Sequence, residues 1–293
     1  MGENGRRLRF GYFLMPEADA PLLDIAQRAD RYGLDLLGIQ DQPYQGRHAD
    51  AHSLMGAVLG ATGRIRVFPA VSCLPLRPPV LLAKAMATLD LVSGGRVELG
   101  LGAGAFRDAI GAYGGPRLTA GDARAALEEA VLLIRSMWDA DGGGVCFRGE
   151  HYRLDGAPPG PVPGRRIDVW LGVTGPRALA LTGRVADGWI ASSARVPPGR
   201  LVDARRRIDE AAKDAGRDPA DIRRIYILSG SFGPGGPGGF LNGDSGQWVG
   251  EIAELALGYG VDSFLYDGDP EYLETFALEI VPAVRETVMR ERA

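Results

Sequence analysis

The stretch RIRVFPAVSCLPLRPPVLLAKAMATLDLVSGGRVELGLGAG, residues 64–104, contains two short apolar runs with a longer run between them. Ile65–Ser72 and Arg96–Gly102 are short, apolar and bounded by turn residues, which is typical of buried strands. Pro79–Leu91 has the length of a helix. Proline at its start costs little, because the N–H groups of a first helical turn have no partner within the helix. Two strands joined by a helix predict parallel pairing with a right-handed crossover.

The same alternation continues on both sides of this stretch. The other predicted strands are Leu8–Leu14, Leu36–Gln40, Ile167–Val173, Gly188–Ala191, Ile222–Gly230 and Val261–Asp267. The other predicted helices are Ala20–Gly33, Ser53–Thr62, Ala120–Trp138, Pro176–Val185, Pro198–Ala215, Gln247–Tyr259 and Pro270–Arg290. Eight such units close most simply into an α/β fold of the (β/α)8 TIM-barrel type. An open doubly wound sheet is the alternative.

Two segments interrupt this rhythm as insertions. Asp141–Arg166 follows the fourth helix and is rich in glycine and proline, which predicts an excursion or a short hairpin. Ser231–Gly246 follows the seventh strand and has few apolar side chains to bury. It is interpreted either as a mobile lid over an active site or as a disordered insertion without a catalytic part.

Composition limits the classes of function. The 293 residues fit one barrel domain spanning 1–293, and the net charge of -4 gives no electrostatic case for nucleic acid or an anionic membrane. No apolar run reaches the length of a transmembrane helix. The two cysteines, Cys73 and Cys146, match no metal or redox spacing. These features predict a soluble cytoplasmic protein without a disulfide.

Barrel enzymes place their active sites at the carboxyl ends of the strands. After the second predicted strand, Asp41, Gln42 and Tyr44 offer groups for the polar edge of a ring, although Asp41 is equally suited to capping the next segment. His48 and His52 are four residues apart, but no third ligand follows at suitable spacing, so no metal site is expected. Either histidine is a candidate proton donor at the pocket mouth.

Three further strand ends suit a flat cofactor with a charged tail. Small or glycine residues let the backbone approach a ligand closely, and free N–H groups at a turn or helix start bind anions. These positions are Ala70, Val71 and Ser72, then Gly102, Ala103 and Gly104, and finally Val173, Thr174, Gly175 and Pro176. Nearby Arg77 is either an anion contact or an ion-pair partner. Together they predict a barrel mouth that binds a phosphate-bearing redox ring.

At these motifs the sequence resembles the luciferase-like monooxygenase superfamily. The resemblance is carried by Leu36–Arg47, Arg64–Gly104 and Val169–Ser192, with SGGR-x-x-LGLG followed later by GPR and GR-x-ADGW. The third stretch is most similar to the F420-dependent oxidoreductase branch. The resemblance implies a barrel that holds a flavin-like ring at the strand ends, with the deazaflavin F420 favoured over FMN as cofactor.

The resemblance also implies roles for single residues. A cis peptide bond without proline is expected at Ala70–Val71 or one bond later, behind the ring. The glycine turns at residues 102–104 and 173–176 are expected to support the cofactor's tail or phosphate. Arg184 and Asp187 are expected to form a structural pair and to take no part in catalysis.

One departure from the F420-dependent pattern bears on the reaction. Those enzymes commonly carry Asp-His after the second strand, and here the pair is Asp41-Gln42. Glutamine cannot exchange a proton near neutral pH. This favours a reductive role, in which hydride passes from reduced F420 to an activated C=C or C=N of a small organic substrate. The proton then comes from Tyr44, His48 or water.

Two other functions remain open. One is an FMN-dependent monooxygenase that uses oxygen and receives reduced flavin from a separate reductase. The other is a non-catalytic flavin-binding barrel. The resemblance further implies a homodimer, and either cofactor implies a separate F420 or flavin reductase as a partner.

Overall fold

A computed structural model describes residues 6–139, 143–232 and 239–292. At its centre lies one parallel sheet in the order β3-β2-β1-β13-β10-β9-β8-β5-β4. Its strands are β1 Arg9–Leu14, β2 Leu36–Ile39, β3 Arg66–Pro69, β4 Ser72–Cys73, β5 Leu99–Gly102, β8 Val169–Gly172, β9 Gly188–Ser192, β10 Arg223–Ser229 and β13 Ser263–Asp267.

The sheet closes on itself between β3 and β5. β3 pairs with β2, whereas β4, the continuation of the same strand, pairs with β5. The Val67 N–H donates to the carbonyl of Arg96 at 2.9 Å, and the Glu98 N–H donates to the carbonyl of Val67 at 3.2 Å. Because β3 and β4 together act as one strand, the ring has the eight parallel strands of a (β/α)8 barrel, and that prediction is confirmed.

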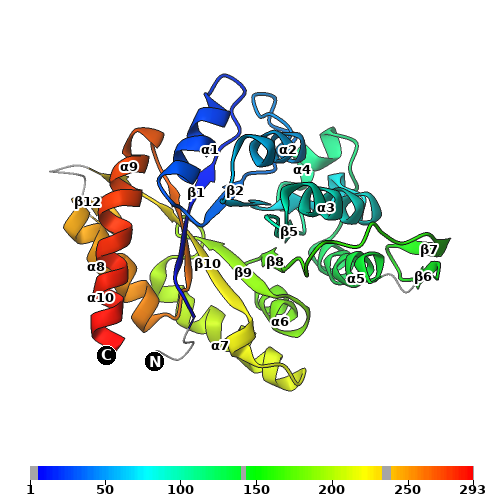
Figure 1. The fold of residues 1–293 in the computed structure, drawn as a ribbon. Coiled ribbons are helices and arrows are strands. Elements are labelled where there is room, and N and C mark those ends of the chain that lie inside the picture. Colours follow the sequence, from blue (N-terminus) through cyan, green and yellow to red (C-terminus); the bar gives the residue numbers. More distant parts are fainter. Residues whose placement is uncertain (1–5, 140–142, 233–238, 293) are drawn as a thin grey trace.

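Helices surround the strands on the outside (Figure 1). They are α1 Leu22–Arg31, α2 Ala51–Ala61, α3 Pro79–Ser93, α4 Arg107–Ala112, α5 Ala120–Trp138, α6 Pro176–Val185, α7 Leu201–Asp214, α8 Ser245–Gly258, α9 Leu273–Thr275 and α10 Val281–Arg292. Phe276–Ile280 joins α9 to α10 as a π-helical segment, and four short 3-10 turns lie at Leu74–Leu76, Pro198–Arg200, Pro219–Asp221 and Pro270–Tyr272. The short helix α4 is an element that the sequence pattern did not predict.

Alternation along the strands separates two cores. Inward-facing side chains such as Phe68, Trp170 and Leu265 fill the barrel, and the Phe68 and Trp170 rings meet edge to face at 4.8 Å. The other face of each strand packs against the helices. At the amino-terminal end of the strands, buried Glu98 pairs with Arg66 at 3.3 Å and with Arg165 at 2.8 Å. This end is filled by ion pairs, so a ligand site is left to the opposite end.

The first insertion is a hairpin, as one of its two interpretations predicted. β6 Val145–Arg148 and β7 Arg153–Ala157 pair antiparallel outside the barrel. In the second insertion β11 Ser231–Phe232 pairs with β12 Asn242–Gly243. Residues 233–238 of this segment lie outside the described residues, and its interpretation as a lid stays a prediction.

Cys73 is buried, Cys146 is exposed, and both are free thiols. Within residues 6–139, 143–232 and 239–292, no helix combines the length and apolar character that crossing a bilayer requires.

Candidate active site at the barrel mouth

The carboxyl ends of the eight strands form a mouth with an apolar floor. Phe13, Ala70, Ile190 and Ile227 belong to the barrel-filling cluster near these ends, and Val71 packs against it. Barrel strands present every second residue inward, so the positions just beyond this floor are those that meet a ligand.

Val71 and two glycines form a cradle in this mouth. The Ala70–Val71 peptide bond is cis, at the first of the two predicted positions. A Cβ added at Gly102 would lie 2.6 Å from Val71 Cγ2, and one added at Gly172 would lie 2.8 Å from Val71 Cγ1. Any side chain at either glycine would therefore collide with Val71, which packs directly against the backbone of both. The two glycines are needed so that Val71 can take this position at the floor of the mouth.

The turn after β5 continues the cradle outward. Gly104 has φ +83, a backbone conformation that side chains rarely adopt, and a Cβ there would lie 2.7 Å from Pro75. Ala103, between the two glycines, is half-buried. Gly104 is therefore required for the turn to pack against Pro75, and the contact of this turn with a cofactor stays a prediction.

The amino terminus of α6 is open to solvent and uncapped. Val173 is buried and its carbonyl accepts the Trp189 indole N–H at 2.8 Å, whereas Thr174, Gly175 and Pro176 are exposed. No side chain caps the helix and no acidic residue lies in its first turn. The partial positive charge of the helix end is therefore available to an anion.

Asp41, after β2, is held by the protein itself. The Arg77 guanidinium donates to both its oxygens, at 2.7 and 3.1 Å, and the Cys73 N–H donates to it at 3.0 Å. Arg77 also donates to Asp50 at 2.6 Å, so the ion-pair interpretation of Arg77 holds. Asp41 thus fixes the end of β2 against β4. Gln42 follows it, and its carbonyl accepts the Gln45 N–H at 2.9 Å.

Possible metal ligands do meet here, in a set that sequence spacing did not predict. Ligand atoms of Asp41, Asp50 and His52 lie within 4.8 Å of one another. Arg77 donates to both carboxylates, so the positive charge that a metal ion would supply is already present. His48 lies before α2 and is not part of the group. The donor set is therefore better described as an ion-pair network.

His52 joins this network to the end of the third strand. Its Nε2 lies 3.1 Å from the hydroxyl of fully buried Ser72. Burial, together with the charge of Arg77, lowers the pKa of His52 below its ordinary value. The ring is therefore neutral at physiological pH and acts as a hydrogen-bond partner of Ser72.

Tyr44 lies at the rim, in contact with residues from two other loops. Its ring centroid is 5.9 Å from that of Phe106, and the Arg195 guanidinium lies over the Phe106 ring at 5.4 Å. Burial raises the pKa of Tyr44 to about 12, helped by nearby negative charge. Its hydroxyl is thus protonated at neutral pH. His48 pairs by its backbone with Glu17, and its Nδ1 is buried without a hydrogen-bond partner.

Sequence reasoning did not select two inward-facing groups. Alternation from Leu36 and Gly38 turns Gln40 toward the barrel, where its Oε1 is buried and has no hydrogen-bond partner among the described residues. Alternation from Leu265 turns Asp267 inward at the end of β13, and the Ser229 hydroxyl of β10 donates to it at 2.6 Å. Burial raises the pKa of Asp267, and the hydrogen bond from Ser229 opposes this. The only sequence signal for both was their place at a strand end.

One predicted pairing is wrong. Asp187 accepts hydrogen bonds from Arg135 at 2.7 Å and Arg166 at 2.6 Å, whereas Arg184 donates to Glu128 at 3.1 Å. Arg184 lies on α6 and pairs with Glu128 of α5, whereas Asp187 lies just before the start of β9. Both residues form structural ion pairs, but with other partners.

Comparison with known proteins identifies the class. A family model for luciferase-like monooxygenases matches residues 8–232. An F420-dependent glucose-6-phosphate dehydrogenase from Nakamurella multipartita is 34% identical over 234 residues, which are 77% of this chain and 68% of that protein. The chain therefore belongs to the luciferase-like monooxygenase family. The predicted family and its F420-dependent branch are confirmed.

Solved structures agree with this fold. An F420-dependent secondary alcohol dehydrogenase in complex with an F420-acetone adduct has a TM-score of 0.85 at 22% identity, covering 95% of this chain and 99% of that one. A riboflavin lyase with modified FMN has a TM-score of 0.83 at 16% identity, covering 96% and 92%. At these identities the likeness shows a shared fold.

Proposed function

We propose that this chain is an F420-dependent oxidoreductase that reduces an activated C=C or C=N bond of a small organic substrate. The observation that carries this is the cradle, where the cis Ala70–Val71 bond places the Val71 side chain so close to Gly102 and Gly172 that neither glycine has room for a Cβ. The open amino terminus of α6 supports it, because an anionic tail leaving the cradle meets unpaired N–H groups there. When bound, F420 supplies the hydride.

The chain's own residues supply orientation and a proton. Gln40 offers an unpaired buried amide oxygen toward the mouth, and the apolar floor excludes water below it. Tyr44 and His48 are the proton donors proposed from sequence. Asp267 joins them, because its raised pKa keeps a larger share of the carboxyl protonated than in water, and Ser229 fixes its Oδ2.

Parallel titration of the protein with F420 and FMN tests the cofactor. We expect F420 to bind more tightly, and Gly102→Ala to weaken it at least tenfold, since the new methyl group meets Val71 Cγ2. Val71→Ala combined with Gly102→Ala removes that methyl group and should recover part of the loss. Gly60→Ala is the matched control, because a Cβ there meets nothing within 4 Å.

The reaction is tested in a single turnover of reduced F420 with an α,β-unsaturated ketone or a cyclic imine. Oxidation of the cofactor without oxygen uptake supports the proposal. Tighter binding of FMN, with oxygen consumed by the reduced flavin, would replace it with the monooxygenase alternative.

A second candidate is oxidation of a sugar phosphate, which is favoured by Arg195 at the rim. Within the described part of the chain this arginine has no carboxylate partner, and it lies over Phe106 in reach of an anionic substrate. The relative from Nakamurella multipartita is named for glucose 6-phosphate. Oxidised F420 mixed with glucose 6-phosphate, but not with glucose, should then be reduced, and Arg195→Ala should abolish the difference.

A further inference from the structure

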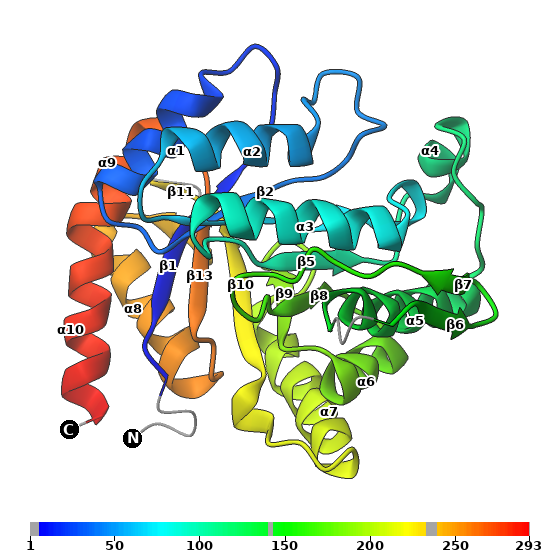
Figure 2. The same ribbon diagram turned by 45° about the vertical axis from the view of Figure 1, so that its right-hand side comes forward.

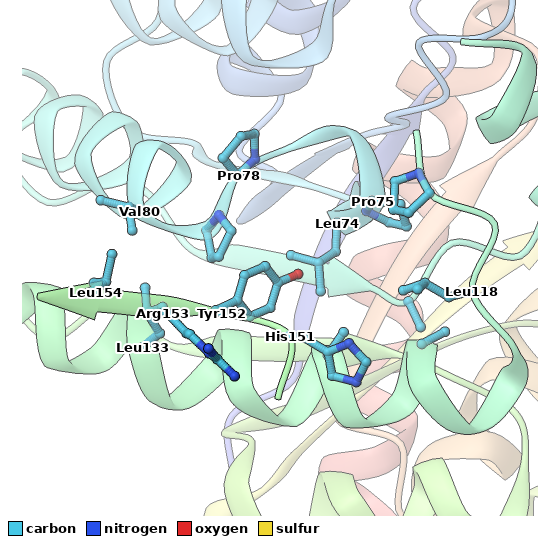
Figure 3. Close-up of a pocket in the computed structure, with 15 residues that line it drawn as sticks. Leu74, Pro75, Pro78, Val80, Leu118, Leu133, His151, Tyr152, Arg153 and Leu154 are labelled. Carbon is cyan, nitrogen blue, oxygen red and sulfur yellow. The ribbon is translucent and has the colours of Figure 1, made fainter. Parts of the chain in front are cut away.

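A cavity of about 360 Å³ lies outside the barrel wall, between α3 and α5 (Figure 3). Leu74 and Val80 form one side, Ala126 and Leu133 of α5 form the other, and Leu154 of β7 covers it. Ala103, in the turn beside the cradle, also borders it. Pro75, against which Gly104 packs, lines it as well, so the turn after β5 lies between the cavity and the barrel mouth.

Two uncharged polar side chains, those of Tyr152 and His151, line this largely apolar cavity. The Tyr152 ring lies across its middle with the hydroxyl turned toward Leu74 (Figure 3). Within the described residues this hydroxyl makes no hydrogen bond, and burial raises the pKa of Tyr152 to about 12, so it is a donor at neutral pH. His151 also lines the cavity, and its Nε2 is buried without a partner. A buried polar atom normally finds a partner, so within the described residues His151 Nε2 calls for one. The Tyr152 hydroxyl is only partly buried and offers a ligand a second hydrogen bond.

The walls are held in place without a ligand. Glu129 of α5 accepts the backbone N–H groups of Glu150, His151 and Tyr152 at 2.7, 2.9 and 3.0 Å. This clamps the turn of the hairpin onto α5 and fixes the backbone of His151 and Tyr152 beside the cavity. A site formed in advance costs a ligand little ordering.

The lining determines the class of ligand. Among the residues that the structure describes, no carboxylate lines the cavity and the one permanent charge, Arg153, is exposed to water. A cavity of roughly 150 Å³ takes up benzene, so this one has room for about two rings. We propose that the cavity is a second ligand site, which takes an uncharged two-ring molecule bearing a hydroxyl or amine. This site is independent of the function proposed for the barrel mouth.

Fluorescence titration with N-phenyl-1-naphthylamine tests the site, because this uncharged two-ring amine becomes bright in apolar surroundings. We expect one saturable site per chain, both without cofactor and with F420 present at saturation. Its sulfonated analogue, 1-anilinonaphthalene-8-sulfonate, should bind more weakly, since the cavity holds no buried cation.

Matched variants place the fluorescent amine in the cavity. Leu154→Trp fills the cavity and should weaken binding at least tenfold, whereas Leu132→Trp adds the same side chain on the exposed side of α5 and should change nothing. His151→Phe removes the acceptor and should weaken binding about three- to tenfold. Full displacement by F420, tighter binding of the sulfonate, or equal binding to both tryptophan variants would each overturn the proposal.

Discussion

Asp267 is a carboxyl group at the barrel mouth that is only partly reached by water. Burial raises its pKa above the ordinary aspartate value of 3.8, against the hydrogen bond from Ser229. The folded protein therefore favours the neutral form more than the unfolded chain does. The stabilisation from this preference is complete below pH 3.8 and is lost as the pH rises through the folded-state pKa.

Asp267→Asn should consequently raise the stability of the protein and lower its activity. Above the folded-state pKa the variant should unfold at a higher temperature than the native protein, because no buried carboxylate remains, and near pH 3.8 the two should agree. If Asp267 donates the proton, kcat should fall about 100-fold. Thermal melts and pH–rate profiles measure both effects. Ser229→Ala removes the hydrogen bond that lowers the pKa of Asp267 and should move the alkaline limb of the profile to higher pH. A profile indifferent to both changes would remove Asp267 from the reaction.

Among the elements, the hairpin of β6 and β7 depends on one side chain of α5. Burial alone would raise the pKa of Glu129, but three backbone N–H donors lower it below the ordinary value of 4.5. Its contribution to stability is therefore present above pH 4.5 and is lost as the pH falls through the folded-state pKa. The hairpin should loosen in mild acid before the barrel does.

Glu129→Ala should release the hairpin at neutral pH as well. Amide hydrogen exchange of Glu150, His151 and Tyr152 should become at least tenfold faster, because their acceptor is gone, while amides of the barrel strands keep their rates. Glu128→Ala is the control, since that carboxylate pairs with Arg184 on the neighbouring helix. Equal effects of the two substitutions would mean that the clamp contributes nothing.

Local sequence pattern was enough to predict most elements of this fold, because buried strands and amphipathic helices have their own periods. It predicted Ile65–Ser72 as one strand, which the structure divides where the pairing partner changes from β2 to β5. It missed α4, which is only six residues long. The point where a strand changes its pairing partner and the position of a short loop helix both depend on how the barrel closes. The residue pattern within one strand carries no information about that closure.

The same limit applied to the site. Glycine turns and strand ends were predicted because their chemistry is local. The Ser229–Asp267 bond was not, since its partners are 38 residues apart and meet only because β10 and β13 are neighbours. The predicted pairing of Arg184 with Asp187 failed for the opposite reason. The two residues are close in sequence, but Arg184 lies in the last turn of α6 and Asp187 just before the start of β9, and their side chains point to different partners.

At the scale of the whole molecule, α3 carries apolar side chains into solvent. It lies on the outside of the barrel (Figure 2), where Leu81 is 64% exposed and Val92 is 75% exposed. Three helical turns separate them, so they share one face. Apolar faces of this kind mark protein interfaces, and we expect a homodimer built on α3.

Light scattering after gel filtration should therefore give twice the chain mass of 31.1 kDa. Leu81→Arg together with Val92→Arg should shift the mass to that of one chain, since charges on both partners would face each other. Leu278→Arg, at an apolar side chain that is 50% exposed elsewhere, should leave the mass unchanged. A native protein with the mass of one chain would refute the dimer.

Ala103 borders both the cradle turn and the outer cavity, and this shared wall has a thermodynamic consequence. If filling one space shifts Ala103, the affinity at the other space changes by some factor, and reciprocity requires the same factor in the reverse direction. Repeating the F420 titration at two concentrations of the naphthylamine would measure that factor. A value other than one would mean that a ligand bound beneath the hairpin of β6 and β7 changes the affinity for the redox cofactor inside the barrel.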